Sequence, residues 1–449
     1  MKTKILNTPI SKAILQISIP VIIANTLQTV YQLIDTFWVG RLGSIAVAAV
    51  SLSFPIIFFL NSLAMGLVMA GSILVAQFNG LGDQEKVNLI SGQTIAFVIL
   101  VASLIAAVGY FAANFLLSFF NASQEILSPA SDYLRFSFVS ILPMFIFMTF
   151  QFMLRSVGEV RLPMFIVLGT VILNFLLDPL LMFGWKFIPA LQVKGVALAT
   201  VITESISALI GLLVLFSGKY RILISIKNMH LKFKWAKKLI TLGFPSSLEM
   251  SARSFGMIFM TIIVANFGTI AIAAYGVGIK ILMFILIPAM GFAMATSSLI
   301  GNSLGACKIN RAEKIAQTGL KISFTILSII GLLIFLFATN LASFLVPHEM
   351  ELITTIVKFI RIMALSFGFI GVQMIVISAI RASGQTITSM SLAVTHAGSI
   401  FVFAYLLAIF FKLNELGIWL AYPLANFVAM LLAFYFYKQK KWLQTKLLQ

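Results

Sequence analysis

The chain has 449 residues, of which 61% are hydrophobic and only 10% are charged, and this composition excludes a mainly soluble globular protein. The formal charge of +18 does not predict a nucleic-acid partner, because the basic residues lie between apolar segments. Cys307 is the only cysteine and the three histidines are far apart in the sequence, so we expect no cofactor and no metal cluster.

Apolar segments of membrane-spanning length follow one another along the whole chain. About 20 apolar residues are enough for a helix to cross a bilayer. In the first half, the predicted helices cover 14–38, 46–78, 91–116, 133–154, 162–184 and 195–217. In the second half, they cover 239–265, 271–302, 318–341, 354–379, 388–411 and 416–437. We therefore predict an all-α integral membrane protein with about twelve transmembrane helices.

The two halves of the sequence resemble one another. One constant shift places Pro20 on Pro245 and Gly66 on Gly291, and a shift that is longer by a single position places Arg155 on Arg381. Six helices in each half bring both halves into the membrane from the same side. This repeat predicts two six-helix lobes related by a pseudo-two-fold axis along the membrane normal.

A basic segment separates the two halves. It contains Lys219, Arg221, Lys227, Lys232, Lys234, Lys237 and Lys238. We predict an amino-terminal lobe over 1–218, a basic cytoplasmic linker over 219–238 and a carboxy-terminal lobe over 239–449. Because basic loops favour the cytoplasmic side, we expect a multi-pass protein of the cell (inner) membrane with both termini in the cytoplasm.

The first half has acidic residues inside three predicted spans, and two of them, Asp178 and Asp35, are the candidates for ion binding. Asn174 and Asp178 are four residues apart on one helix face, and Pro179 removes the next backbone donor, so oxygen atoms gather at this point. Asp35 lies late in the first span. Oxygen atoms of this kind suit a hard cation, and a desolvated carboxyl suits a proton. A structural hydrogen-bond network between helices is the alternative.

The second half has a different set of polar residues. Glu249 and Arg253 are four residues apart, so they either form a neutralising pair or take part in transport. Lys280 is a candidate for a cation that stabilises its lobe by bonding to carbonyl groups. In the first half, Glu204 of the sixth span is close enough to the helix end to be partly solvated. We interpret His396 as a hydrogen-bonded packing residue.

Several segments resemble the multidrug and toxic compound extrusion (MATE) family, and the resemblance covers nearly the whole chain. It rests on the order and spacing of Tyr31–Gly40, Gln77–Gly80, Leu154–Glu159, Asn174–Gly184, Gly195–Thr200 and Gly301–Ala306. The most specific segment is Asn174–Gly184, which reads NFLLDPLLMFG. The predicted helix X carries no acidic residue over Ser366–Gln373, so the pattern is DinF-like rather than NorM-like.

The resemblance implies a secondary antiporter that exports organic, cationic or amphipathic compounds in exchange for protons or sodium ions. Its implied coupling site, for H+ or Na+, consists of Asp35, Asn174, Asp178 and Thr200, and Pro20 matches a position where helix I bends. Glu249 matches an acidic position that some members use in the second lobe. Arg253, next to Glu249, weakens that second site. Apart from a sodium ion at the first site, we expect no metal.

Other functions are open at this point. A flippase for lipids or lipid-linked precursors is the main alternative, although Arg253 and Lys280 are few for a cationic cavity. An enzyme is not expected, because the sequence has no Walker A motif and no recognisable nucleophile and base. The partners we expect are small organic substrates and membrane lipids, and we expect a monomer.

Overall fold

A computed structural model describes residues 8–118, 123–186, 189–346, 349–444 and 447, without the side chains of residues 253, 254 and 258. The long helices of the first half are α1 (Ile10–Gly40), α2 (Ser44–Leu81), α3 (Gln84–Ser118), α4 (Gln124–Ser156), α5 (Arg161–Phe183) and α6 (Val193–Ser217). Those of the second half are α8 (Phe233–Ala265), α9 (Thr269–Gly305), α10 (Ile309–Leu336), α12 (Met350–Ala364), α13 (Phe367–Ala382), α14 (Thr386–Ala404) and α15 (Asn414–Lys438). The shorter elements are α7 (Ile226–Met229), α11 (Ala338–Leu345), a π-helical continuation of α14 (Tyr405–Phe410) and a final 3₁₀ turn (Lys441–Leu443).

The prediction of about twelve membrane-spanning helices is confirmed. Within the described residues, 11 helices are long and apolar enough to cross a membrane. The pair α12 and α13 adds a twelfth span, which is bent by 48° at its break. The predicted spans agree with these helices, except that the tenth span is this broken pair.

Hydrogen bonds hold the break between α12 and α13. Ser366 lies at the break, and its Oγ accepts a hydrogen bond from Asn426 Nδ2 of α15 at 2.8 Å. The Oδ1 atom of Asn426 lies 2.8 Å from His396 Nε2 of α14. His396 is therefore hydrogen-bonded inside its apolar helix, as its position in the sequence predicts.

Contacts divide the chain into two compact units. One unit is Ile23–Ser247, and the other combines the chain up to Ile22 with Leu248–Gln449. The chain thus passes from one unit to the other within α1 and again within α8, at positions that the sequence repeat relates to one another. The lobes predicted over 1–218 and 239–449 assign the starts of both helices differently, and their boundaries stay a prediction.

Two repeat-related glycines explain why the starts of α1 and α8 pack as they do. A Cβ atom on Gly66 of α2 would overlap the backbone of Ser247 in α8, and one on Gly291 of α9 would overlap the side chain of Ile22 in α1. The shift that places Gly66 on Gly291 also places Ile22 on Ser247, so it relates both members of these pairs. Each unit thus contains the start of a helix whose remainder belongs to the other unit.

The basic segment between the halves is bound to the start of α3. Gln93 Nε2 donates hydrogen bonds to the carbonyl oxygens of Asn228 at 2.7 Å and His230 at 2.6 Å. Gln93 Oε1 accepts a third from the backbone N–H of Lys232 at 2.7 Å. Since α8 begins at Phe233, the last residues of the predicted linker are helical.

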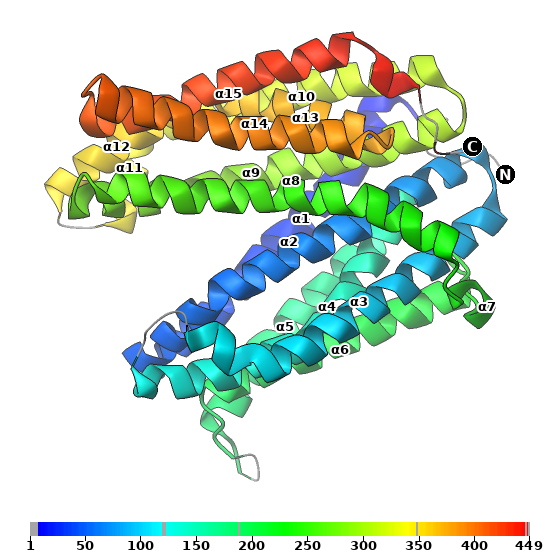
Figure 1. Ribbon diagram of the computed structural model, residues 1–449, viewed down its shortest axis with the longest axis horizontal. Helices are drawn as coiled ribbons and strands as arrows, with labels where there is room; N and C mark the ends of the chain where they lie inside the picture. Colours follow the sequence, from blue (N-terminus) through cyan, green and yellow to red (C-terminus); the bar gives the residue numbers. More distant parts are fainter. Residues whose placement is uncertain (1–7, 119–122, 187–188, 347–348, 445–446, 448–449) are drawn as a thin grey trace. The chain divides into compact units, whose positions relative to one another are not determined.

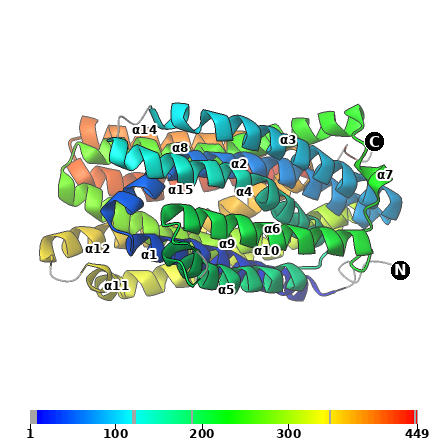
Figure 2. The same cartoon turned by 90° about the horizontal axis from the view of Figure 1, so that it is seen from below.

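The described chain ends lie at one end of their own unit. Arg311 Nη2, at the start of α10, donates a hydrogen bond to the carbonyl oxygen of Thr8 at 2.7 Å. Glu313 of α10 forms an ion pair with Lys440, just after α15, at 2.8 Å. Within the same unit, α14 and α15 lie side by side (Figure 1), and α9 runs along α10 (Figure 2).

The close helix approach at the two glycines predicts a ranked loss of stability. Gly66→Ala should lower the free energy of unfolding by about 3 kcal/mol, because its Cβ atom meets backbone that cannot move independently. Gly291→Ala should cost less, since the side chain of Ile22 can change rotamer. Gly276→Ala in α9 is the matched control, with no atom within 4 Å of its Cβ position. Thermal unfolding in detergent measures all three, and equal midpoints would contradict the packing.

Candidate functional site

The candidate site begins on the buried face of α5. Asn174 and Asp178 lie one helical turn apart, and both side chains are fully buried. Asn174 Nδ2 donates a hydrogen bond to Asp178 Oδ1 at 3.2 Å. The other oxygen of each side chain, Asn174 Oδ1 and Asp178 Oδ2, is buried without a hydrogen-bond partner among the described residues. This turn of α5 therefore offers free acceptor atoms inside the protein.

Asp35 of α1 brings a second carboxyl group to the same place. Its side chain interacts with the side chains of Asp178 and Asn174, and within the described part of the chain its buried Oδ1 atom has no hydrogen-bond partner. None of the ion pairs among the described residues includes Asp35 or Asp178. Two neighbouring carboxylates without a basic partner repel one another, so the arrangement favours a shared proton or a bound cation.

Hydroxyl groups from α6 and α1 lie near Asp35. The hydroxyl of Tyr31 lies 3.2 Å from Thr203 Oγ1 and also interacts with the side chain of Thr200. Thr200 Oγ1 donates to the carbonyl oxygen of Val196 at 3.2 Å. The structure thus brings Asp35, Asn174 and Asp178 together, and it joins Thr200 to them through Tyr31.

A glycine allows α6 to approach α5 closely at this site. A Cβ atom on Gly195 would lie 2.6 Å from the carbonyl group of Leu181. The chain before α6 also returns along the end of α5, where the N–H groups of Leu191 and Gln192 donate to Leu181 and Met182 at 3.0 Å. This contact fixes the first turns of α6, and with them the position of Thr200.

Pro20 lies inside α1, and its side chain is buried. The helix continues through this position without a break, from Ile10 to Gly40. The passage of the chain between the two units falls just after it, between Ile22 and Ile23. The bend at Pro20 that the resemblance implies therefore stays a prediction, which concerns another conformation of the protein.

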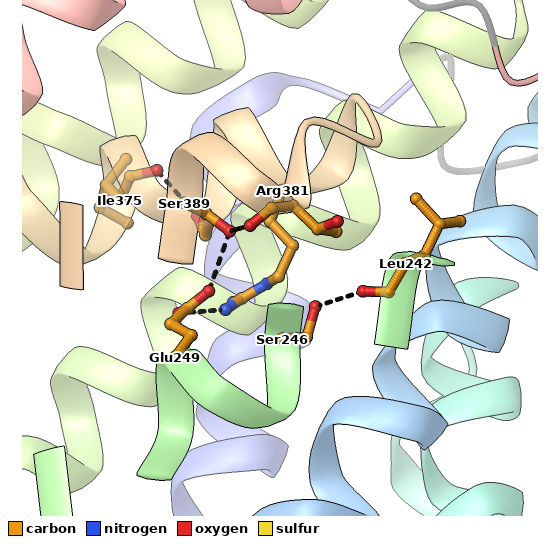
Figure 3. A network of polar contacts seen from close by, with 8 residues as sticks. Leu242, Ser246, Glu249, Ile375, Arg381 and Ser389 are labelled. Carbon is orange, nitrogen blue, oxygen red and sulfur yellow. Dashed lines mark hydrogen bonds and ion pairs between the residues drawn. The ribbon is translucent and has the colours of Figure 1, made fainter. Parts of the chain in front are cut away.

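The second-half acid Glu249 is neutralised by a residue that the sequence analysis did not pair with it. Arg381 Nη1 of α13 contacts Glu249 Oε1 at 2.7 Å, and Ser389 Oγ of α14 donates to Glu249 Oε2 at 2.9 Å (Figure 3). Both charged side chains are buried. The side chain of Arg253, the partner predicted for Glu249, lies outside the described residues. The network joins α8, α13 and α14.

Two other charged residues of the spans, Lys280 and Glu204, differ in their exposure. Lys280 is exposed on α9, and its role in stabilising the lobe stays a prediction. Glu204 lies near the middle of α6 and is buried, with 5% of its surface exposed. The expectation that Glu204 is partly solvated is wrong, because residues of α1, α4 and α5 surround its side chain.

Sequence reasoning missed Arg381, Ser389 and Tyr31 as residues of these sites, and it missed the proximity of Glu204 to Asp35. Arg381 belongs to the repeated segment Ile380–Gln385, but the sequence does not reveal that this segment meets α8. Tyr31 lies one turn before Asp35 on the same helix face, which is a signal that the spacing contains. The proximity of Glu204 to Asp35 depends on how α6 packs against α1, and no pattern in the sequence predicts it.

Repeated helical halves with buried, unneutralised carboxyl groups in one half are an architecture typical of membrane transporters. The MatE family profile matches residues 20–180 and 245–406, so the chain belongs to the MatE family. The starts of the two matched segments differ by the shift that places Pro20 on Pro245. Their ends differ by the shift that places Arg155 on Arg381. The family prediction and the repeat are thus confirmed.

Named relatives align with most of the chain. The "Probable multidrug resistance protein YoeA" of Bacillus subtilis is 28% identical over 439 residues, which cover 96% of this chain and 94% of the relative. The "FAD transporter" of Shewanella oneidensis is 27% identical over 389 residues, covering 86% and 85%. A solved MOP superfamily transporter from Pyrococcus furiosus shares the fold, with a TM-score of 0.90 at 24% identity and coverage of 98% and 97%.

The buried pair of Glu249 and Arg381 leads to a prediction about stability. Arg381→Met should lower the free energy of unfolding by about 3 to 5 kcal/mol, because Glu249 is left charged and buried. The double variant Glu249→Leu/Arg381→Met should recover most of this loss, since neither charge remains. Thermal unfolding in detergent measures both. A single variant as stable as the unmodified protein would contradict the pairing.

Proposed function

We propose that the chain is a secondary active antiporter of the cell membrane that exports organic, cationic or amphipathic compounds in exchange for protons or sodium ions. It acts as a monomer, with both termini in the cytoplasm. The observation that carries the proposal is the pair of Asp35 and Asp178, which has buried, unpartnered oxygen atoms and no basic neighbour among the described residues.

The pair has two states of different charge. With a proton or a sodium ion bound, the repulsion between the two carboxylates is removed, and α1 and α5 can stay close. Without it, the repulsion favours a shift of α1 away from α5. Substrate and ion then favour different conformations by a few kcal/mol, and this difference in affinity couples their movements. Asn174 and Thr200 supply further oxygen atoms to the loaded state.

Helix α1 is suited to transmit the change. Asp35 lies thirteen residues beyond Ile22, where the chain passes between the compact units, and that separation is about 20 Å along a helix. Pro20 lies just before this passage and weakens the helix locally by removing one backbone donor. A movement at Asp35 can therefore reach the part of α1 that belongs to the other unit.

The names of the relatives support this function in its general form. YoeA is named as a multidrug resistance protein. The Shewanella oneidensis relative is named for FAD, which carries phosphate groups and an aromatic ring system. Together they support an organic substrate class. The DinF-like subtype stays a prediction from the sequence.

Transport of a lipid or lipid-linked precursor is the second candidate. Lys280 favours it, since an exposed lysine inside an apolar helix is costly against lipid tails and suits an anionic head group. A lipid-scrambling assay with Lys280→Gln tests this candidate. Scrambling that depends on Lys280 would support a flippase, and the absence of scrambling by the unmodified protein would exclude it.

Removal of one carboxyl charge should abolish export. Asp35→Asn keeps the size of the side chain but fixes it in a neutral state, so the pair can no longer alternate between loaded and empty. Cells that produce this variant should retain ethidium as do cells without the protein, while its amount in the membrane is unchanged.

Asp83→Asn is the matched control. Asp83 lies at the surface turn before α3, where its Oδ1 accepts the N–H of Lys86 at 3.0 Å, and asparagine caps a helix equally well. Ethidium export by this control should equal that of the unmodified protein. Undiminished export by Asp35→Asn would contradict the proposal.

A further inference from the structure

Glu204 is a third acidic residue buried in the unit that contains Asp35 and Asp178. It lies near the middle of α6, and no residue that the structure describes forms a hydrogen bond with its Oε2 atom. None of the ion pairs among the described residues includes it. An ionised carboxylate without a partner in such surroundings carries a large desolvation cost, so this residue needs a ligand or a proton.

Glu204 borders a small cavity of about the size of a water molecule. The other residues that line it are Gln28 and Tyr31 of α1, Phe147 of α4, and Val167, Thr170 and Val171 of α5. An organic substrate does not fit into this space. The ligand of Glu204 is therefore a small cation or a proton.

The oxygen atoms around the cavity favour a proton over a sodium ion. Thr170 Oγ1 already lies 2.5 Å from Ser207 Oγ, and the hydroxyl of Tyr31 lies 3.2 Å from Thr203 Oγ1. A hard metal cation requires several oxygen ligands at once, and few acceptors remain for it here. A proton needs only the carboxyl group and a water molecule to deliver it.

The charges near Glu204 come from the candidate coupling site. Asp35 and Tyr31 of α1 are close enough to interact electrostatically with Glu204. Asp178 of α5 and Tyr133 of α4 in turn interact with Asp35. No lysine, arginine or histidine is among the residues that line the cavity. The charge state of Glu204 thus responds to the loading of the Asp35 and Asp178 pair.

We propose that Glu204 is an additional proton-binding carboxyl of this unit, which takes up and releases its proton through the water-sized cavity as the Asp35 and Asp178 pair changes its load. The inference rests on the proposed function, because it gives the coupling site a third acidic group. It predicts that at least one proton moves through Glu204 even if the pair itself binds sodium.

An infrared pH titration of the full chain in lipid vesicles tests the proposal, by following the carbonyl stretch that only protonated carboxyl groups give. Glu204→Gln should lose a pH-dependent component of this band that Asp35→Asn retains. Glu85→Gln is the control, since Glu85 is exposed in the first turn of α3, and it should leave that component unchanged. Glu204→Asp should keep the component with a shifted midpoint, which a merely structural role would not produce.

The result that overturns the proposal is a pH-dependent band that is the same in Glu204→Gln and the unmodified protein. The proposal is also overturned if the component of the band that Glu204→Gln loses does not change with pH in the unmodified protein. The titration needs no transport, so the two proposals can fail separately. If Glu204→Gln loses the component while ethidium export by the unmodified protein depends on neither ion gradient, the antiport proposal fails and the proton-site proposal stands. If the band is unaffected while export follows a gradient, the proton site fails and antiport stands.

Discussion

The meeting of Asp35 and Asp178, with no basic neighbour among the residues that the structure describes, is the constraint on which the proposed mechanism depends. Helices α1 and α5 supply the two acids, and Gly195 lets α6 come close enough to add hydroxyl groups. Such a pair is unfavourable in a low-dielectric interior unless a proton or cation neutralises part of its charge. The same instability makes the site responsive, because a change of one charge alters which helix positions are stable.

The two halves of the repeat treat their buried acids in opposite ways. Glu249 is held by Arg381 and Ser389, so its charge is compensated within the protein. At the shifted positions, Met260 corresponds to Asp35 and Ile400 corresponds to Asn174. A compensated pair fixes helices in place, whereas an uncompensated pair can change its charge. We infer that one half is the energised one and that the other is mainly structural.

The sequence predicted the fold well because hydropathy and the repeat are carried by many residues. The spans and the family follow from such patterns, and Asn174 and Asp178 share a face by helical spacing alone. Contacts between helices were not accessible in this way. Glu249 binds Arg381, which is distant in the sequence, and Glu204 is buried by its neighbours rather than by its place in α6. The starts of α1 and α8 each belong to a different unit from the rest of the helix, and this arrangement likewise depends on packing at Gly66 and Gly291.

The central claim is that the uncompensated carboxyl pair uses an ion gradient to drive export. Its most direct test is ethidium transport by the purified protein in proteoliposomes, with proton and sodium gradients imposed separately. The account predicts that a gradient of at least one of these ions accelerates transport in the opposite direction, and that the acceleration disappears when both Asp35 and Asp178 are replaced by asparagine. Transport that is equally fast without any gradient, or acceleration that survives both replacements, would contradict it.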